Sequence, residues 1–123
     1  MKNEYGVTLD RNGYAPSIIE EHSETCCWNC GRNGNGNPLN RHEVFYGPFR
    51  EKSKRLGLWV YLCHNGCHQG RYGVHENWYA DWKLKNCAQH AAMRHYHWSE
   101  EDFIREFGRS YINPCDYERE DDV

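Results

Sequence analysis

Two pairs of cysteines are the feature of this sequence that most constrains its fold. Cys27 and Cys30 lie in the run Cys-Cys-Trp-Asn-Cys-Gly, and Cys63 and Cys67 follow further along the chain. A C-x-x-C turn places two thiolates on one side of the chain, and a second pair completes the four sulfur ligands of a tetrahedral zinc site. Cys26 could replace Cys27, but only Cys27 gives the two-residue spacing to Cys30. The sequence therefore predicts a structural Zn²⁺ bound by Cys27, Cys30, Cys63 and Cys67.

The number of cysteines and the N-terminal sequence indicate the cellular compartment of the protein. The chain has seven cysteines, an odd number, so at least one stays unpaired in any disulfide framework. The N-terminus has no apolar region of the signal-peptide type, and no apolar run approaches the ~20 residues of a membrane helix. We therefore expect a cytoplasmic protein with no membrane partner, in which Cys87 and Cys115 do not bind metal.

Size and composition indicate one small domain that needs a metal. The chain has 123 residues, and 38% of them are hydrophobic, which is low for a packed core. A bound metal ion would compensate for the small core. We expect a loosely ordered N-terminal arm over 1–25, a zinc-stabilised domain over 26–112 and an acidic C-terminal tail over 113–123.

The local patterns predict an α+β fold. Residues 39–46 and 58–62 are rich in strand-forming side chains, and Gly47-Pro48 ends the first run. These two strands would form a hairpin around a basic loop. Apolar positions recur at helical intervals over 78–97, which predicts a long helix. Ser99 resembles an N-cap, and a short C-terminal helix should end at Gly108.

Charge is distributed unevenly along the chain. The formal net charge is −3, but the tail alone carries −4, so the remaining residues carry +1. Residues 41–55 carry +3, which could neutralise phosphates of a nucleic acid. The alternative is a solvated basic loop with no partner. The candidate nucleic-acid contacts are Arg41, Arg50, Lys52, Lys54, Arg55 and Arg71.

A second constellation has the side chains that a reactive metal site needs. It consists of His42, Glu43, His68 and His75, and imidazole and carboxylate groups are common ligands of divalent cations. The other histidines are expected to lie outside this site, and three of them are expected on an exposed helix surface. These others are His22, His64, His90, His95 and His97.

Three sequence runs resemble a known family. They are C-W-N-C-G, then L-N-R-H-E-V-F-Y-G, then L-W-V-Y-L-C-H-N-G-C-H-Q-G-R-Y-G-V-H. Together they resemble the HNH endonuclease superfamily (the ββα-metal or His-Me finger nucleases), particularly its phage-borne members. The resemblance covers about residues 26–77, and it implies a ββα-metal fold built on a treble-clef zinc finger.

The resemblance also implies roles for particular residues. The four cysteines match the structural zinc site, and His42, His68 and His75 match ligands of a catalytic cation such as Mg²⁺, Mn²⁺, Ni²⁺ or Zn²⁺. Glu43 falls where the family has the histidine that activates water, and an apolar run stands where its central asparagine is expected. The base would be Glu43, or His42 in another register, and a nearby arginine could steady the phosphate.

The sequence thus predicts a metal-dependent DNA endonuclease of phage or prophage origin. A non-catalytic zinc-finger module that binds DNA or protein is the alternative, because it would need the cysteines but not the histidines. A phage recombination accessory factor that uses the acidic tail to dock a protein partner is a further form of this alternative.

Overall fold

A two-stranded antiparallel hairpin forms the centre of the fold. The computed structural model describes residues 1–19, 26–31, 36–69, 73–75 and 77–113. Strand β1 (Leu39–Glu43) pairs with β2 (Trp59–Cys63), and His42 lies opposite Val60. Strand β2 (Trp-Val-Tyr-Leu-Cys) consists of branched, aromatic and apolar residues, which suit a pleated and half-buried surface, whereas β1 (Leu-Asn-Arg-His-Glu) is mostly polar. The predicted hairpin is confirmed.

The segment between the strands differs from the prediction of a basic loop. It forms a short 3-10 helix, η1 (Gly47–Phe49), and an α-helix, α1 (Arg50–Leu56). Pro48 lies in the first turn of η1, a position that suits proline because its fixed φ angle is already helical. Gly57 ends α1 in the left-handed conformation (φ +77°), and a side chain there would overlap the carbonyl oxygen of Pro16.

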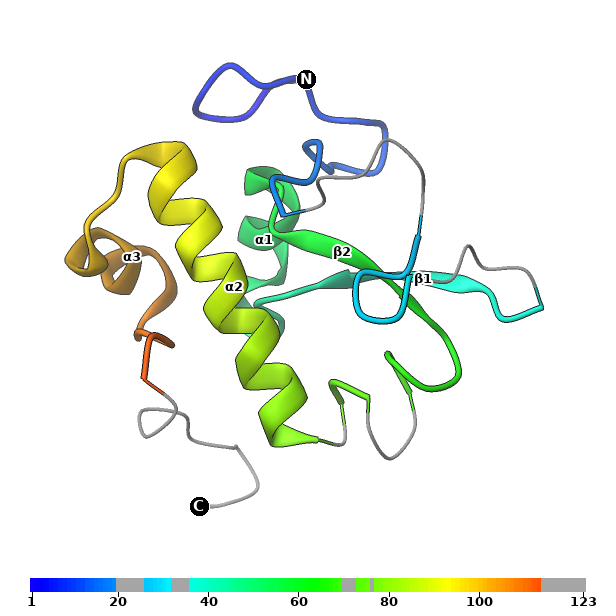
Figure 1. The fold of residues 1–123 in the computed structure, drawn as a ribbon. Helices are drawn as coiled ribbons and strands as arrows, with labels where there is room; N and C mark the ends of the chain where they lie inside the picture. Colours follow the sequence, from blue (N-terminus) through cyan, green and yellow to red (C-terminus); the bar gives the residue numbers. More distant parts are fainter. Residues whose placement is uncertain (20–25, 32–35, 70–72, 76, 114–123) are drawn as a thin grey trace.

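Two further helices complete the predicted α+β fold. Helix α2 (Trp78–Tyr96) begins at Asn77, whose side chain accepts hydrogen bonds from two backbone N–H groups of its first turn. Helix α3 (Glu100–Phe107) begins with a capping box between Ser99 and Asp102, and Gly108 ends it. Figure 1 shows α2 running between the hairpin and α3.

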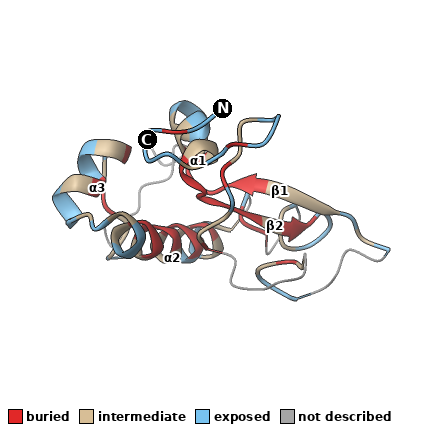
Figure 2. Ribbon diagram, turned by 90° about the horizontal axis from the view of Figure 1, so that it is seen from above, coloured by how far each residue is buried: buried red, intermediate tan, exposed pale blue. Residues whose placement is uncertain are grey.

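The core joins residues of the hairpin, α2 and α3, and Figure 2 shows buried residues gathered on the strands and on α2. Leu84, Ala88 and Ala92 of α2 and Phe103 of α3 are fully buried, and Phe107 of α3 is nearly so. The two phenylalanine rings stack with their centroids 4.9 Å apart. The hairpin, α2 and α3 therefore share one buried core. No helix in the described ranges is both long and apolar enough to cross a membrane.

The first nineteen residues lie against α1 and β2 without forming a helix. The sequence predicted a loosely ordered arm for 1–25; within the described part, Leu9, Ala15 and Ile19 are buried. The Ala15 N–H donates to the carbonyl oxygen of Lys54 at 2.9 Å, and the Trp59 indole N–H donates to the Ala15 carbonyl at 2.7 Å. These contacts tie the segment to the folded domain.

Candidate metal centres

The four cysteines predicted as ligands come together at one end of the hairpin. Cys27 and Cys30 lie in the turn before β1, Cys63 is the last residue of β2, and Cys67 lies in the loop that follows. Their sulfur atoms all lie within 4.8 Å of one another. The Trp28 N–H donates to the Tyr61 carbonyl oxygen at 2.7 Å, which fixes the first turn on β2.

The sulfur spacing suits a tetrahedral metal ion. Sulfurs about 2.3 Å from a tetrahedral Zn²⁺ are about 3.8 Å from one another. The Sγ atoms of Cys30 and Cys63 are 3.8 Å apart. Cys27 and Cys63 are buried, whereas Cys30 is exposed, so the cluster lies at the edge of the core. The four sulfurs could therefore hold a metal ion such as Zn²⁺.

Backbone N–H groups around the sulfurs favour the thiolate form of Cys27. Burial acts to raise the pKa of Cys27, but backbone N–H groups that include that of Cys30 lower it to about 7. Burial raises the pKa of Cys67 to about 12, and the neighbouring thiols add to this rise. A bound divalent cation would stabilise the thiolate form of all four cysteines, including Cys67, whose pKa is raised without it.

The other cysteines lie outside this cluster. Cys26 and Cys87 are half-buried and do not belong to the group of four sulfurs. Cys115 lies outside the described residues. The structure thus gathers Cys27 rather than Cys26, as the two-residue spacing indicated.

Three histidines form a second cluster beside the hairpin. His42 comes from β1, His68 directly follows Cys67, and His75 lies shortly before α2. Each ring offers a nitrogen within 4.8 Å of the others, and the Nε2 atoms of His68 and His75 are 2.9 Å apart. His42 is 3% exposed whereas His75 is exposed, so the cluster opens to solvent at His75.

His42 has an orphaned nitrogen inside this cluster. Its Nε2 atom is buried and has no hydrogen-bond partner among the described residues. Burial lowers the pKa of His42 to about 3, and the neighbouring His68 and His75 add to this effect. Burial and the charge of His75 also lower the pKa of His68. These neutral imidazoles could bind a divalent cation, and an ion would satisfy the His42 nitrogen.

A buried polar group that the sequence analysis missed stands next to the histidines. The ring of Tyr46 lies 5.9 Å from that of His42, and its hydroxyl donates to Asp81 Oδ2 at 3.1 Å. Lys85 pairs with the same carboxylate at 2.9 Å, and both residues of this pair are buried. The spacing of Asp81 and Lys85 by one helical turn is visible in the sequence, but that pattern is common on exposed helices.

Glu43 does not join the histidine cluster. Neighbouring residues of a strand point to opposite faces, so Glu43 faces away from the side of β1 that holds His42. Its carboxylate accepts hydrogen bonds from the Tyr14 hydroxyl at 2.7 Å and from Arg50 Nε at 3.0 Å. Burial acts to raise the pKa of Glu43, but these two donors lower it. The carboxylate is therefore held in its ionised form.

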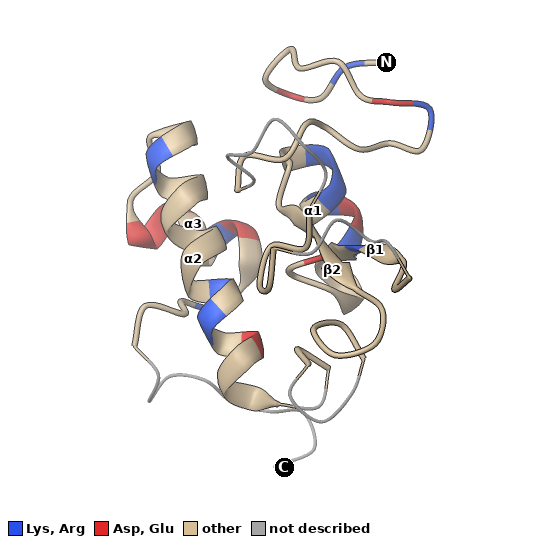
Figure 3. Ribbon diagram, turned by 45° about the vertical axis from the view of Figure 1, so that its right-hand side comes forward, with Lys and Arg blue, Asp and Glu red and all other residues tan. Residues whose placement is uncertain are grey.

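The five predicted nucleic-acid contacts that lie in the described residues are already engaged within the chain. Figure 3 shows Lys and Arg gathered on α1, next to acidic residues. The guanidinium of Arg41 lies over the rings of Tyr14 and Trp59, at 4.2 and 4.4 Å from their centroids, and pairs with Asp10. Arg71 lies outside the described residues. Four further bases pair with acids within 4.0 Å: Arg50 with Glu43, Lys52 with Glu106, Lys54 with Glu51 and Arg55 with Glu4.

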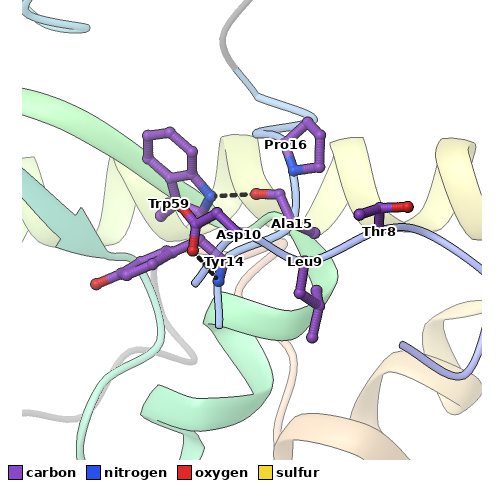
Figure 4. Close-up of a pocket in the computed structure, with 7 residues that line it drawn as sticks. All are labelled: Thr8, Leu9, Asp10, Tyr14, Ala15, Pro16 and Trp59. Carbon is purple, nitrogen blue, oxygen red and sulfur yellow. Dashed lines mark hydrogen bonds between the residues drawn. The ribbon is translucent and has the colours of Figure 1, made fainter. Parts of the chain in front are cut away.

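A shallow pocket of about 280 Å³ lies on the N-terminal segment. One wall is the Trp59 indole, held by its hydrogen bond to the Ala15 carbonyl, and Asp10 accepts from the Tyr14 N–H (Figure 4). None of its lining residues is a histidine or a cysteine, so it is separate from both clusters. They are Thr8, Leu9, Asp10, Tyr14, Ala15, Pro16 and Trp59.

Comparison with protein families, with curated proteins and with solved structures finds no match for this chain. The class of the protein is therefore defined by its own fold and sites. It is a small α+β domain with a four-cysteine cluster that could bind a metal, and a three-histidine cluster lies against the same hairpin.

Proposed function

We propose that this protein is a metal-dependent endonuclease of the HNH type that hydrolyses phosphodiester bonds in DNA. The observation that carries the proposal is the convergence of His42, His68 and His75 around a buried nitrogen that lacks a hydrogen-bond partner in the described residues. Three imidazoles with one side open to solvent would suit a catalytic cation, which keeps a position for substrate or water.

The three histidines would hold a cation such as Mg²⁺, Mn²⁺, Ni²⁺ or Zn²⁺. When bound, such an ion polarises a phosphodiester and stabilises the leaving oxygen. His42 supplies a ligand from the rigid strand β1, and His75 lies on the solvent side, where a DNA backbone could approach. The four-cysteine site would hold a structural Zn²⁺ that fixes the loop carrying His68.

The resemblance assigns the general base to Glu43. Its carboxylate faces away from the side of β1 that holds His42, so the attacking water would have to lie on the Glu43 side rather than among the histidines. The depressed pKa of Glu43 makes it a weak proton acceptor near neutral pH, because the driving force for proton transfer falls as the pKa of the base falls. Arg50 holds the carboxylate in place at 3.0 Å. The basic residues of 41–55 and Arg71 are the proposed phosphate contacts, and those within the described ranges would have to exchange an internal partner for phosphate.

The second candidate function is a non-catalytic zinc module that binds DNA or protein. The internal pairing of the basic residues on α1 and the low pKa of Glu43 favour it. In either form we place the protein in the reducing cytoplasm of a prokaryotic host, where thiols stay available for metal. The acidic tail would then be the segment that docks a protein partner.

Plasmid nicking tests the proposal. Supercoiled DNA is incubated with the zinc-loaded protein and Mg²⁺, Mn²⁺, Ni²⁺ or Zn²⁺, and nicked circles are separated on a gel. We expect His75→Ala to abolish nicking with unchanged zinc content and melting temperature, and His90→Ala, on α2, to retain it. The opposite result is a wild-type protein that nicks no supercoiled, branched or single-stranded DNA with any of these metals and binds one Zn²⁺ only. That result would overturn the nuclease proposal in favour of the binding module.

A further inference from the structure

Asn40 links the histidine cluster to the strand that carries His42. It lies two residues before His42 on β1, and residues two apart in a strand share a face. Its amide oxygen Oδ1 is 2.7 Å from Nδ1 of His64 and 3.2 Å from Nδ1 of His68. One side-chain oxygen of the strand therefore meets two rings of the loop that follows β2.

The loop holds the two rings in place for this contact. The His68 N–H donates to the carbonyl oxygen of Cys63 at 3.0 Å, and the Gln69 N–H donates to that of His64 at 3.0 Å. The His64 N–H donates to the Pro38 carbonyl at 2.7 Å, which ties the loop to the start of β1. The backbone thus sets the distance from each ring to the Asn40 amide oxygen.

An amide oxygen only accepts hydrogen bonds, so the His68 ring must carry its proton on Nδ1. In a neutral imidazole the other nitrogen then has a free lone pair. For His68 that nitrogen is Nε2, the atom 2.9 Å from Nε2 of His75. The Asn40 contact therefore leaves the lone pair of His68 on the nitrogen that faces His75.

We propose that Asn40 is a positioning residue, whose amide oxygen fixes His68 in the Nδ1–H form so that Nε2 is the metal-binding atom. The proposal rests on the metal site of the proposed function. Hydrogen bonds to the second nitrogen of a ligating histidine raise its basicity and fix its orientation, and their loss typically weakens metal binding by about 10- to 100-fold. His64 shares the same oxygen but does not belong to the cluster.

The tautomer of His68 is the first measurement. In ¹⁵N-labelled protein with Zn²⁺ in the cysteine site and no other metal, two-bond ¹H–¹⁵N spectra at neutral pH report which ring nitrogen is protonated. We expect Nδ1–H for His68 in the wild type and a mixture of tautomers in Asn40→Ala. A wild-type His68 protonated on Nε2 would mean that the amide nitrogen of Asn40 faces the ring, which would overturn the proposal.

The second measurement is Ni²⁺ affinity by calorimetry. Binding at the histidine cluster is identified as the part of the signal that is absent in His75→Ala. We expect binding about 10- to 100-fold weaker in Asn40→Ala, restored in Asn40→Asp, whose carboxylate still accepts from Nδ1. His64→Ala is the matched control and should bind Ni²⁺ within about threefold of the wild type. Zinc content and melting temperature establish that each variant is folded.

These two measurements separate the two proposals. If Asn40→Ala binds Ni²⁺ as tightly as the wild type, Asn40 has no positioning role, even though the metal site stands. If the wild type binds no Ni²⁺ at the histidines, the proposed function fails, and the tautomer spectrum still decides whether Asn40 orients His68.

Discussion

The sulfur atoms of Cys30 and Cys63 lie 3.8 Å apart, although 33 positions separate the two residues in the chain. The contact joins the turn before β1 to the last residue of β2. A metal ion between them would close the loop that contains both strands and α1, which explains how so small a core could keep its hairpin in register.

Removing one sulfur should therefore unfold the hairpin. We expect Cys30→Ser, or a strong chelator, to release Zn²⁺ and to abolish the cooperative melting of the wild type, because binding of a structural Zn²⁺ can contribute ~10 kcal/mol or more to folding. Elemental analysis and calorimetry measure the two effects.

Cys26→Ser is the matched control, since Cys26 is next to Cys27 but outside the cluster. It should keep one Zn²⁺ per chain, and its free energy of unfolding should change by about 1 kcal/mol or less. A chelated wild-type protein with an unchanged melting temperature would contradict the structural role of the metal.

The buried hydroxyl of Ser53 should be a stability determinant of α1. It is fully buried, donates to the carbonyl oxygen of Phe45 at 2.7 Å and accepts from the Phe45 N–H at 3.2 Å. Ser53→Ala leaves both backbone groups without this partner, and we expect a loss of about 1–3 kcal/mol in the free energy of unfolding. Urea denaturation measures it, with the exposed Thr8→Ala as the control; equal midpoints for the two variants would contradict the prediction.

The strands, α2 and α3 could be predicted from the sequence because each has a local pattern. Ser99 and Gly108 mark the ends of α3, and the apolar positions of α2 recur at the helical period. Helix α1 could not be predicted in this way. It is seven residues long, only Ser53 and Leu56 are buried, and its charges suit a loop equally well.

The sequence predicted some residues of the candidate sites and not others. The four sulfurs could be predicted from cysteine spacing, since two residues separate Cys27 from Cys30 and three separate Cys63 from Cys67, and such short spacings place both sulfurs of a pair on one turn. The histidine cluster depended on a resemblance, and the face of Glu43 depended on the strand alternation that separates it from His42. The contacts of Asn40 and Asp81 depend on tertiary packing between β1, the following loop and α2, which has no local sequence signal.

Glu43→Gln should separate a catalytic role from a structural one. If Glu43 is the base, the nicking rate should fall by about 10²-fold, the low end of the range for a general base, because its pKa is already depressed. Metal content and DNA affinity should not change. The control is Glu51→Gln on α1, an exposed acid paired with Lys54 at 3.7 Å. An unchanged rate in Glu43→Gln would show that the carboxylate has only a structural role, through its contacts with Tyr14 and Arg50.

Tyr14 should make the protein less stable at alkaline pH. Burial raises the pKa of Tyr14 to about 12, and its hydrogen bond to the Glu43 carboxylate adds to the rise, whereas the unfolded phenol has a pKa of 10.0. A group with a raised pKa in the folded state contributes its stability below the unfolded value and loses it as the pH rises through the folded one. We therefore expect the free energy of unfolding to fall between pH 10 and about pH 12.

Tyr14→Phe removes this titration and tests its origin. The variant should be about 1 kcal/mol less stable at neutral pH, because the Glu43 carboxylate loses a hydrogen-bond donor, but its stability should fall less steeply than that of the wild type above pH 10. Tyr79→Phe, at a side chain that is 53% exposed, should keep the wild-type slope. Urea denaturation at a series of pH values measures the slopes, and absorbance at a tyrosinate wavelength follows the phenol directly. Parallel curves for wild type and Tyr14→Phe would show that the Tyr14–Glu43 contact does not hold the phenol neutral.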